Sequence, residues 1–67
     1  MKEKVKDILE MLLNQKVNED ISMENCDAWD SMKHIEIIMT LEDALDVSFN
    51  VEDIPHLTSM VKILEKL

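Results

Sequence analysis

The chain has 67 residues without a single glycine and with only one proline, and this narrows the folds open to it more than any other feature. Leucine, isoleucine, methionine, lysine and glutamate predominate, a composition that as a whole favours helices over strands. A chain of this length has room for one domain, and it buries only about 60% of the surface of its unfolded state. We therefore expect a single all-α domain over residues 1–67, a compact bundle without a deep enzyme cleft.

Near the start of the chain, apolar residues recur with the spacing of an amphipathic helix. The positions i, i+3, i+4, i+7 and i+8 are occupied by Val5, Ile8, Leu9, Leu12 and Leu13. This pattern predicts a first helix over residues 2 to about 14. Residues 15–30 are rich in Asn, Asp and Ser with scattered apolar positions, which is typical of a long loop whose apolar residues enter the core. A loop of this length in a compact domain is normally functional.

The second half of the chain predicts three further helices. One runs from about Ser31 to Asp46 and buries Ile38, Leu41 and Leu45, helped by Ile37 and Ala44. A short one begins near Asn50, an N-cap with acidic Asp53 three residues later, and Pro55 keeps it short. Thr58 is expected to cap the last, with Met60 as an adaptable filler and with inward-facing Val61, Leu64 and Leu67. The prediction is a small four-helix bundle of three main helices and one short helix.

Ser31 lies at the junction between the polar loop and the second predicted helix, in the segment DAWDSM over residues 27–32. Unpaired backbone N–H groups and the positive end of the helix dipole favour a phosphate at such a position. A phosphoester on Ser31 would therefore be stabilised there. Ser and Asp before a helix are also ordinary N-caps, so the surrounding sequence decides between the two interpretations.

The segment DSMKHIEIIMTLEDALD, residues 30–46, resembles the attachment motif and second helix of acyl carrier proteins. The family pattern is Asp-Ser-Leu, an aliphatic residue, Glu, further aliphatic residues, Met, a small residue, Leu and then acidic residues. The similarity continues without a gap through Ile54, Leu57, Thr58 and Ser59 and the stretch 61–67, so it spans essentially the whole chain. Asp-Ser-Met alone is a weak motif, but the ungapped register of the following residues makes it specific. The resemblance implies a helical bundle of the acyl carrier protein type.

The resemblance also implies carriage of a cargo rather than catalysis. In this family a separate transferase moves the 4′-phosphopantetheine of coenzyme A onto the motif serine, and the terminal thiol of the arm then holds an acyl or aminoacyl group as a thioester. By resemblance, Ser31 is the attachment residue and Asp30 assists attachment. The chain would carry acyl intermediates of a specialised fatty-acid, polyketide or related biosynthetic pathway.

The resemblance extends to residues that meet partner enzymes. The acidic positions that meet Arg and Lys of partners are matched by Glu36, Glu42 and Asp43. The apolar positions that face the partner or the arm are matched by Met32, Ile35 and Met39. An ordinary solvated helix face is the alternative for the carboxylates, and plain core is the alternative for the apolar residues, equally so for Ile35. The implied partners are a phosphopantetheinyl transferase, an acyl-loading ligase or transferase, and synthase enzymes with basic docking patches.

Three residues around the motif depart from carriers of fatty-acid synthesis. Trp29 replaces a small residue, and Trp-Asp-Ser looks more like stand-alone carriers of specialised pathways or peptidyl carrier domains. Lys33 and His34 place positive or titratable charge just after the serine, where a housekeeping carrier is acidic or neutral. A lone helical histidine is usually a surface or interface residue, which is our expectation for His34. These departures favour a dedicated set of partners.

The formal net charge of −8 is concentrated in the middle of the chain. Residues 17–61 hold eleven of the fifteen acidic residues and a single base, Lys33. Such a field opposes binding to nucleic acid and to anionic membranes and attracts basic protein patches, although it also serves solubility alone. No segment reaches the roughly 20 apolar residues of a membrane helix, and charges interrupt residues 1–13 too often for a signal peptide. We expect a cytoplasmic monomer.

The sequence offers no constellation typical of an enzyme. Cys26 is the single cysteine, so it can form no internal disulfide, and with two scattered histidines it predicts no metal site. No nucleophile and base pair and no phosphate-binding glycine loop are present, so we expect no catalytic activity. Two alternatives to the acyl carrier remain: a stand-alone aminoacyl or peptidyl carrier protein, and an unmodified acidic helical interaction module in which Ser31 is only a cap.

Overall fold

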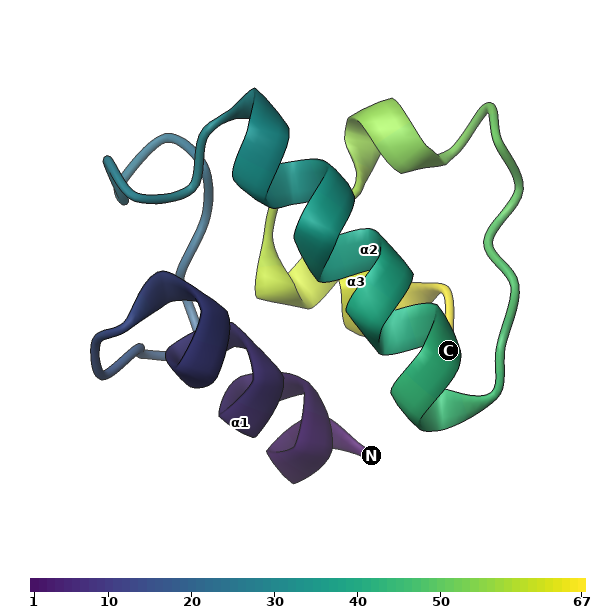
Figure 1. Ribbon diagram of the computed structural model, residues 1–67, viewed down its shortest axis with the longest axis horizontal. Helices are drawn as coiled ribbons and strands as arrows, with labels where there is room; N and C mark the ends of the chain where they lie inside the picture. Colours follow the sequence, from purple (N-terminus) through teal and green to yellow (C-terminus); the bar gives the residue numbers. More distant parts are fainter.

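The computed structural model describes residues 1–67 and contains three α-helices, one short 3-10 helix and no strand (Figure 1). The elements are α1 (Lys2–Leu13), α2 (Ser31–Leu45), η1 (Ile54–His56) and α3 (Met60–Glu65). The all-α prediction is confirmed, and so are the extents of the first two helices. The predicted third helix is a single 3-10 turn. None of the helices combines the length and the apolar character that crossing a membrane requires.

The three α-helices enclose one core. α1 contacts both α2 and α3, and α3 passes behind α2 in the view of Figure 1. The apolar faces predicted from the helical spacing of α1 and α2 are largely the buried ones, and their fully buried members are Val5, Leu9, Ile37 and Leu41. Ala44 is exposed and Leu45 only partly buried, so the predicted burial at the end of α2 is partly wrong.

Both long helices end on a left-handed residue. Asn14 has φ 56° and Asp46 has φ 54°, and each occupies the C-cap position of its helix. Glycine is the usual residue in this region, and asparagine and aspartate tolerate it best among the others. The glycine-free chain therefore terminates α1 and α2 with the two residue types that cost least there.

The loop between α1 and α2 is fastened to the start of α3. Met23 N donates to Thr58 O at 2.9 Å, Met60 N donates to Ile21 O at 3.1 Å, and Ser22 and Ser59 form an isolated antiparallel bridge. The loop also places apolar side chains in the core, as predicted: Val17, Ile21, Cys26 and Trp29. At its other end, an ion pair of 2.9 Å joins Glu19 to Lys2 of α1. The hydrogen bond from Lys2, and then its charge, lowers the pKa of Glu19.

The predicted cap and inward face of the last helix are wrong by one position. Ser59, not Thr58, is the N-cap, and its hydroxyl accepts a hydrogen bond from Lys62 N at 3.1 Å. The carbonyl oxygen of Thr58 instead accepts the hydrogen bond from Met23 N in the loop. With the cap one residue later, α3 buries Met60 and Ile63. Of the three residues predicted to face inward, Leu64 packs partly buried against the core, whereas Val61 is 53% exposed and Leu67 also faces solvent.

The segment before α3 is also simpler than predicted. Asn50 accepts hydrogen bonds from the backbone of Asp53 and Ile54 through its carbonyl, so it closes a turn rather than capping a helix with its side chain. Asp53 is the residue that precedes η1, without a capping hydrogen bond from its side chain. Pro55 lies within the first two positions of η1, consistent with its predicted role in keeping this element short. The turn brings Ile54 close to the beginning of α2.

Candidate functional site

Ser31 is the first residue of α2, and its side chain is exposed. Its hydroxyl makes no hydrogen bond within the chain, and the backbone N–H groups of Ser31 and Met32 have no partner there. Such free N–H groups are expected in the first turn of a helix, where no preceding carbonyl is in reach. The site therefore combines an accessible hydroxyl with donors and a dipole end that favour an anion.

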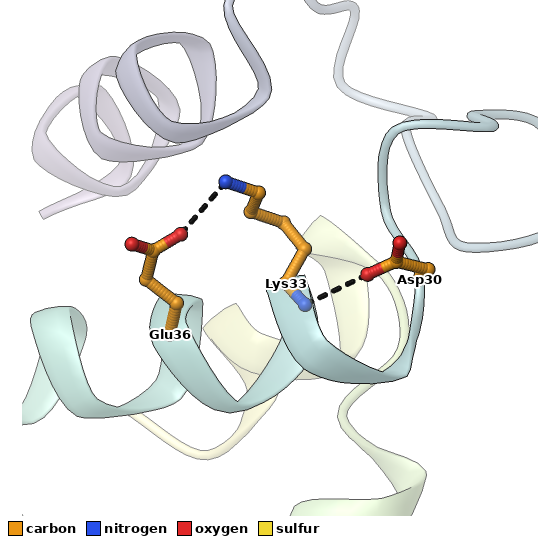
Figure 2. Close-up of polar contacts among 3 residues, drawn as sticks. All are labelled: Asp30, Lys33 and Glu36. Atoms are coloured by element: carbon orange, nitrogen blue, oxygen red, sulfur yellow. Dashed lines mark hydrogen bonds and ion pairs between the residues drawn. The ribbon is translucent and has the colours of Figure 1, made fainter.

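Asp30 is the N-cap of α2. Its backbone is extended, with φ −99° and ψ −175°, and its Oδ1 accepts a hydrogen bond from Lys33 N at 2.8 Å (Figure 2). Its carbonyl oxygen accepts from His34 N, also at 2.8 Å. Because Asp30 provides the cap, the hydroxyl of Ser31 is not needed for this purpose. The capping interpretation of this dipeptide is correct for Asp30 and wrong for Ser31.

Lys33 and Glu36 form an ion pair on the same side of α2, with Nζ 2.7 Å from Oε1 (Figure 2). Glu36 is still exposed, so this carboxylate is on the surface as predicted. Exposed ion pairs one turn apart contribute little stability. A basic residue of a partner could therefore replace Lys33 as the counterion of Glu36. The negative charge of Glu36 is nevertheless offset by Lys33 within the chain.

The other two predicted acidic contacts differ from each other. Glu42 is partly buried, and its Oε2 accepts a hydrogen bond from Phe49 N at 2.9 Å, which holds the segment after α2 against the helix. Glu42 is therefore less available to a partner than predicted, because the backbone of Phe49 already bonds one of its carboxylate oxygens. Asp43 is exposed and has no partner within the chain. Of the three carboxylates, Asp43 alone is both exposed and free.

The predicted apolar contacts form an exposed stripe. Met32, Ile35 and Met39 are spaced i, i+3 and i+7, which places them along one side of α2. Ile35 is 52% exposed, and the two methionines are more so. The core alternative is therefore wrong for all three residues. The stripe begins next to Ser31.

An open hollow of about 360 Å³ lies beside Ser31. It brings together the long loop, the start of α2 and η1. Apolar atoms make up most of its surface, although polar side chains also line it, and the lining residues are Met23, Ser31, His34, Ile35, Ile54, Pro55 and Thr58. A group attached to the Ser31 hydroxyl would have this apolar surface next to it. The hollow is open to solvent, so such a group would lie along the protein without being enclosed.

His34 was expected at the surface or at an interface, and the structure places it in the interior. It is 6% exposed, not on the surface, and both ring nitrogens have partners. Trp29 Nε1 donates to Nδ1 at 3.0 Å, and Nε2 contacts the carbonyl oxygen of Ile54 at 2.8 Å. Its spacing could have indicated burial, because position 34 precedes Ile37, Ile38 and Leu41 by three, four and seven residues on the buried face of α2.

Cys26 and the remaining polar groups add no second site. The thiol is buried and lies 3.5 Å from Gln15 Nε2. No three His, Cys, Asp or Glu side chains gather in a way that could hold a metal ion.

In comparisons with known proteins, the chain matches no family model, and no curated protein matches it significantly.

Proposed function

We propose that this chain is an acyl carrier protein that receives a 4′-phosphopantetheine arm on Ser31 and presents acyl groups on that arm to partner enzymes. The observation that supports this best is the free, exposed hydroxyl of Ser31 at the first position of α2, within the Asp-Ser-Met motif. The order of elements, three α-helices with one short helix before the last, agrees with a bundle of the acyl carrier protein type.

The residues around Ser31 fit such an arm. On attachment, the Ser31 hydroxyl loses its proton to a base of the transferase and forms an ester bond to phosphorus, displacing adenosine 3′,5′-bisphosphate from coenzyme A. The resulting phosphodiester charge would lie at the helix terminus, near the free N–H groups of Ser31 and Met32. The arm supplies a terminal thiol for the acyl cargo. Ile35, Ile54 and Pro55 offer apolar contacts next to the attachment point.

The surface of α2 fits partner enzymes whose docking patches combine apolar and basic residues. Its exposed apolar stripe suits the centre of a transient interface, and Asp43 suits a basic residue at the rim. The proposed partners are a phosphopantetheinyl transferase, an acyl-loading ligase or transferase, and synthase enzymes. Glu36 is paired with Lys33, and Glu42 accepts a hydrogen bond from Phe49 N. The acidic part of this surface is therefore smaller than the sequence alone indicates.

Intact mass measurement tests the proposal. Incubation with coenzyme A, Mg²⁺ and a broad-specificity phosphopantetheinyl transferase should add one phosphopantetheinyl group to the wild type. Ser31→Ala should gain no mass and should keep its helical circular dichroism spectrum, because Asp30 provides the cap. Ser48→Ala, at another exposed serine, should gain mass as the wild type does.

The outcomes separate the candidate functions. A wild type that never gains mass, or a Ser31→Ala variant that gains it equally, would contradict the carrier proposal. An acidic helical interaction module would then be the better interpretation. For a modified protein, the additional mass after incubation with candidate loading enzymes distinguishes acyl cargo from aminoacyl cargo.

A further inference from the structure

Three segments around Ser31 meet at one buried imidazole. Trp29 ends the long loop, His34 lies one turn into α2, and Ile54 begins η1. The indole N–H of Trp29 donates to His34 Nδ1 at 3.0 Å, and Nε2 lies 2.8 Å from the carbonyl oxygen of Ile54. Trp29 is 2% exposed and His34 is 6% exposed, so water does not substitute readily for either bond.

These two partners determine the protonation state of the ring. An indole N–H can only donate, and a backbone carbonyl can only accept. Nδ1 of His34 must therefore be bare and Nε2 must hold the proton, so the observed arrangement requires a neutral imidazole. A second proton, on Nδ1, would face the indole N–H. Trp29 would then be left with a buried donor and no acceptor, which is a costly arrangement.

The ring geometry offers the imidazolium no compensation from the indole. The two rings are 24° from parallel with centroids 6.1 Å apart, and a hydrogen bond joins their edges. His34 therefore lies beside the indole rather than over its face, where a cation would be attracted.

Charged groups nearby do not compensate either. On α2, the Asp30 carboxylate bonds Lys33 N, and Lys33 Nζ pairs with Glu36. Beside η1, Asp53 pairs with Lys66 at 3.6 Å, and His56 is exposed. In the long loop, the next acidic residue before Asp30 is Asp27, which is exposed. No carboxylate forms a hydrogen bond or an ion pair with the His34 ring.

We propose that His34 is a pH-sensitive latch that holds the end of the long loop to α2 beside Ser31. Neutral His34 holds both Trp29 and Ile54 to α2, and a second proton, on Nδ1, releases the indole while the bond from Nε2 to the Ile54 carbonyl stays. The latch rests on the contacts of His34 alone. Its consequence for the attachment site, a loop that is less firmly held next to Ser31 in mild acid, rests on the proposed function of Ser31.

The chain contains one tryptophan and no tyrosine, so its intrinsic fluorescence reports Trp29 alone. We expect the emission of the unmodified protein to change in one transition as the solution is acidified from about pH 8. His56→Gln removes the exposed histidine and should keep this transition. His34→Gln should abolish it. Because no arm is attached in this experiment, its result is independent of whether Ser31 accepts phosphopantetheine.

Nuclear magnetic resonance of the wild type tests the latch without a variant, in case His34→Gln fails to fold. At pH 8, the ¹⁵N shifts of His34 should show the tautomer with the proton on Nε2. On acidification, the protection factor of the Trp29 indole N–H against exchange should fall by about 5- to 150-fold, as expected when one buried donor loses its acceptor. Protection of the Trp29 indole N–H that stays constant on acidification, or a fluorescence transition that persists in folded His34→Gln, would overturn the proposal.

Discussion

Asp30 and Ser31 are adjacent, yet they have separate tasks. Asp30 satisfies the backbone of the first turn of α2 through its carboxylate, which leaves the neighbouring hydroxyl without a structural partner. If the serine had been the cap, its oxygen would be engaged with the backbone and less available as a nucleophile. The division of tasks between these two residues thus leaves an accessible hydroxyl at the proposed attachment site.

This division predicts different effects for two substitutions of Asp30. Asp30→Asn keeps a side-chain oxygen for Lys33 N, whereas Asp30→Ala removes it, and both variants lose the same charge. We expect Asp30→Ala to be less stable than Asp30→Asn by about 1 kcal/mol, the usual value of an N-cap. For a domain of this size that corresponds to a thermal midpoint lower by about 4–8 °C. Thermal circular dichroism measures it, and equal midpoints would show that the cap contributes little.

Single residues also show where sequence reasoning ends. Position 34 lies on the buried helical face, so the burial of His34 could be predicted from its spacing. Its acceptor, the Ile54 carbonyl, is twenty positions away and belongs to no pattern in the sequence. Glu42 is similar, because its bond to Phe49 N depends on how the chain turns after α2. Contacts that depend on the path of a loop were not predictable from local periodicity.

At the scale of elements, length decides how well the sequence predicts a helix. α1 and α2 have 12 and 15 residues, so several apolar positions agree on one buried face. α3 has 6 residues, fewer than two turns, and one misplaced cap rotates its predicted face. The bridge between the long loop and residue 59 determines the true start of α3, and this pairing is not visible in the sequence.

The corrected face of α3 predicts a sharp contrast between neighbouring positions. Ile63 is fully buried, so Ile63→Ala should lower the free energy of unfolding by about 2–5 kcal/mol. Val61 faces solvent, so Val61→Ala should change it by less than about 0.5 kcal/mol. Urea denaturation followed by circular dichroism measures both.

A 67-residue domain has a total stability of only about 3–10 kcal/mol, so Ile63→Ala could abolish folding. Ile63→Val is then the measurable variant, with an expected loss of about 0.5–1.5 kcal/mol. If Val61→Ala proved the more damaging substitution, the inward face of α3 would be the one that the sequence pattern alone indicated.

At the scale of the whole molecule, the acidic surface is uneven in its availability to a partner. α1 mixes lysines with carboxylates, and the two predicted docking carboxylates Glu36 and Glu42 are engaged within the chain. Asp43 is the remaining one, and its side chain is exposed on α2. If the acidic face of α2 steers basic enzymes, Asp43 is where a single charge reversal should have the largest effect.

Asp43→Lys is therefore expected to slow the transfer of phosphopantetheine to Ser31, and Asp7→Lys on α1 is the matched control. Both aspartates are exposed, lie on helices and form no side-chain bond in the chain, so the two substitutions change the net charge equally and break no contact. We expect Asp43→Lys to lower kcat/KM by up to about 5-fold at low salt, the value of one exposed ion pair, with kcat unchanged. Initial rates at several protein concentrations give both constants.

Ionic strength separates steering from general acidity. Near 0.15 M salt the Debye length is about 8 Å, so the difference between Asp43→Lys and the wild type should shrink markedly. A difference that persists at high salt would indicate a direct contact, because salt screens encounter rates more than short-range bonds. If Asp43→Lys and Asp7→Lys slowed transfer equally at low salt, the net charge of −8 would be sufficient to explain association, and no docking role could be assigned to the acidic end of α2.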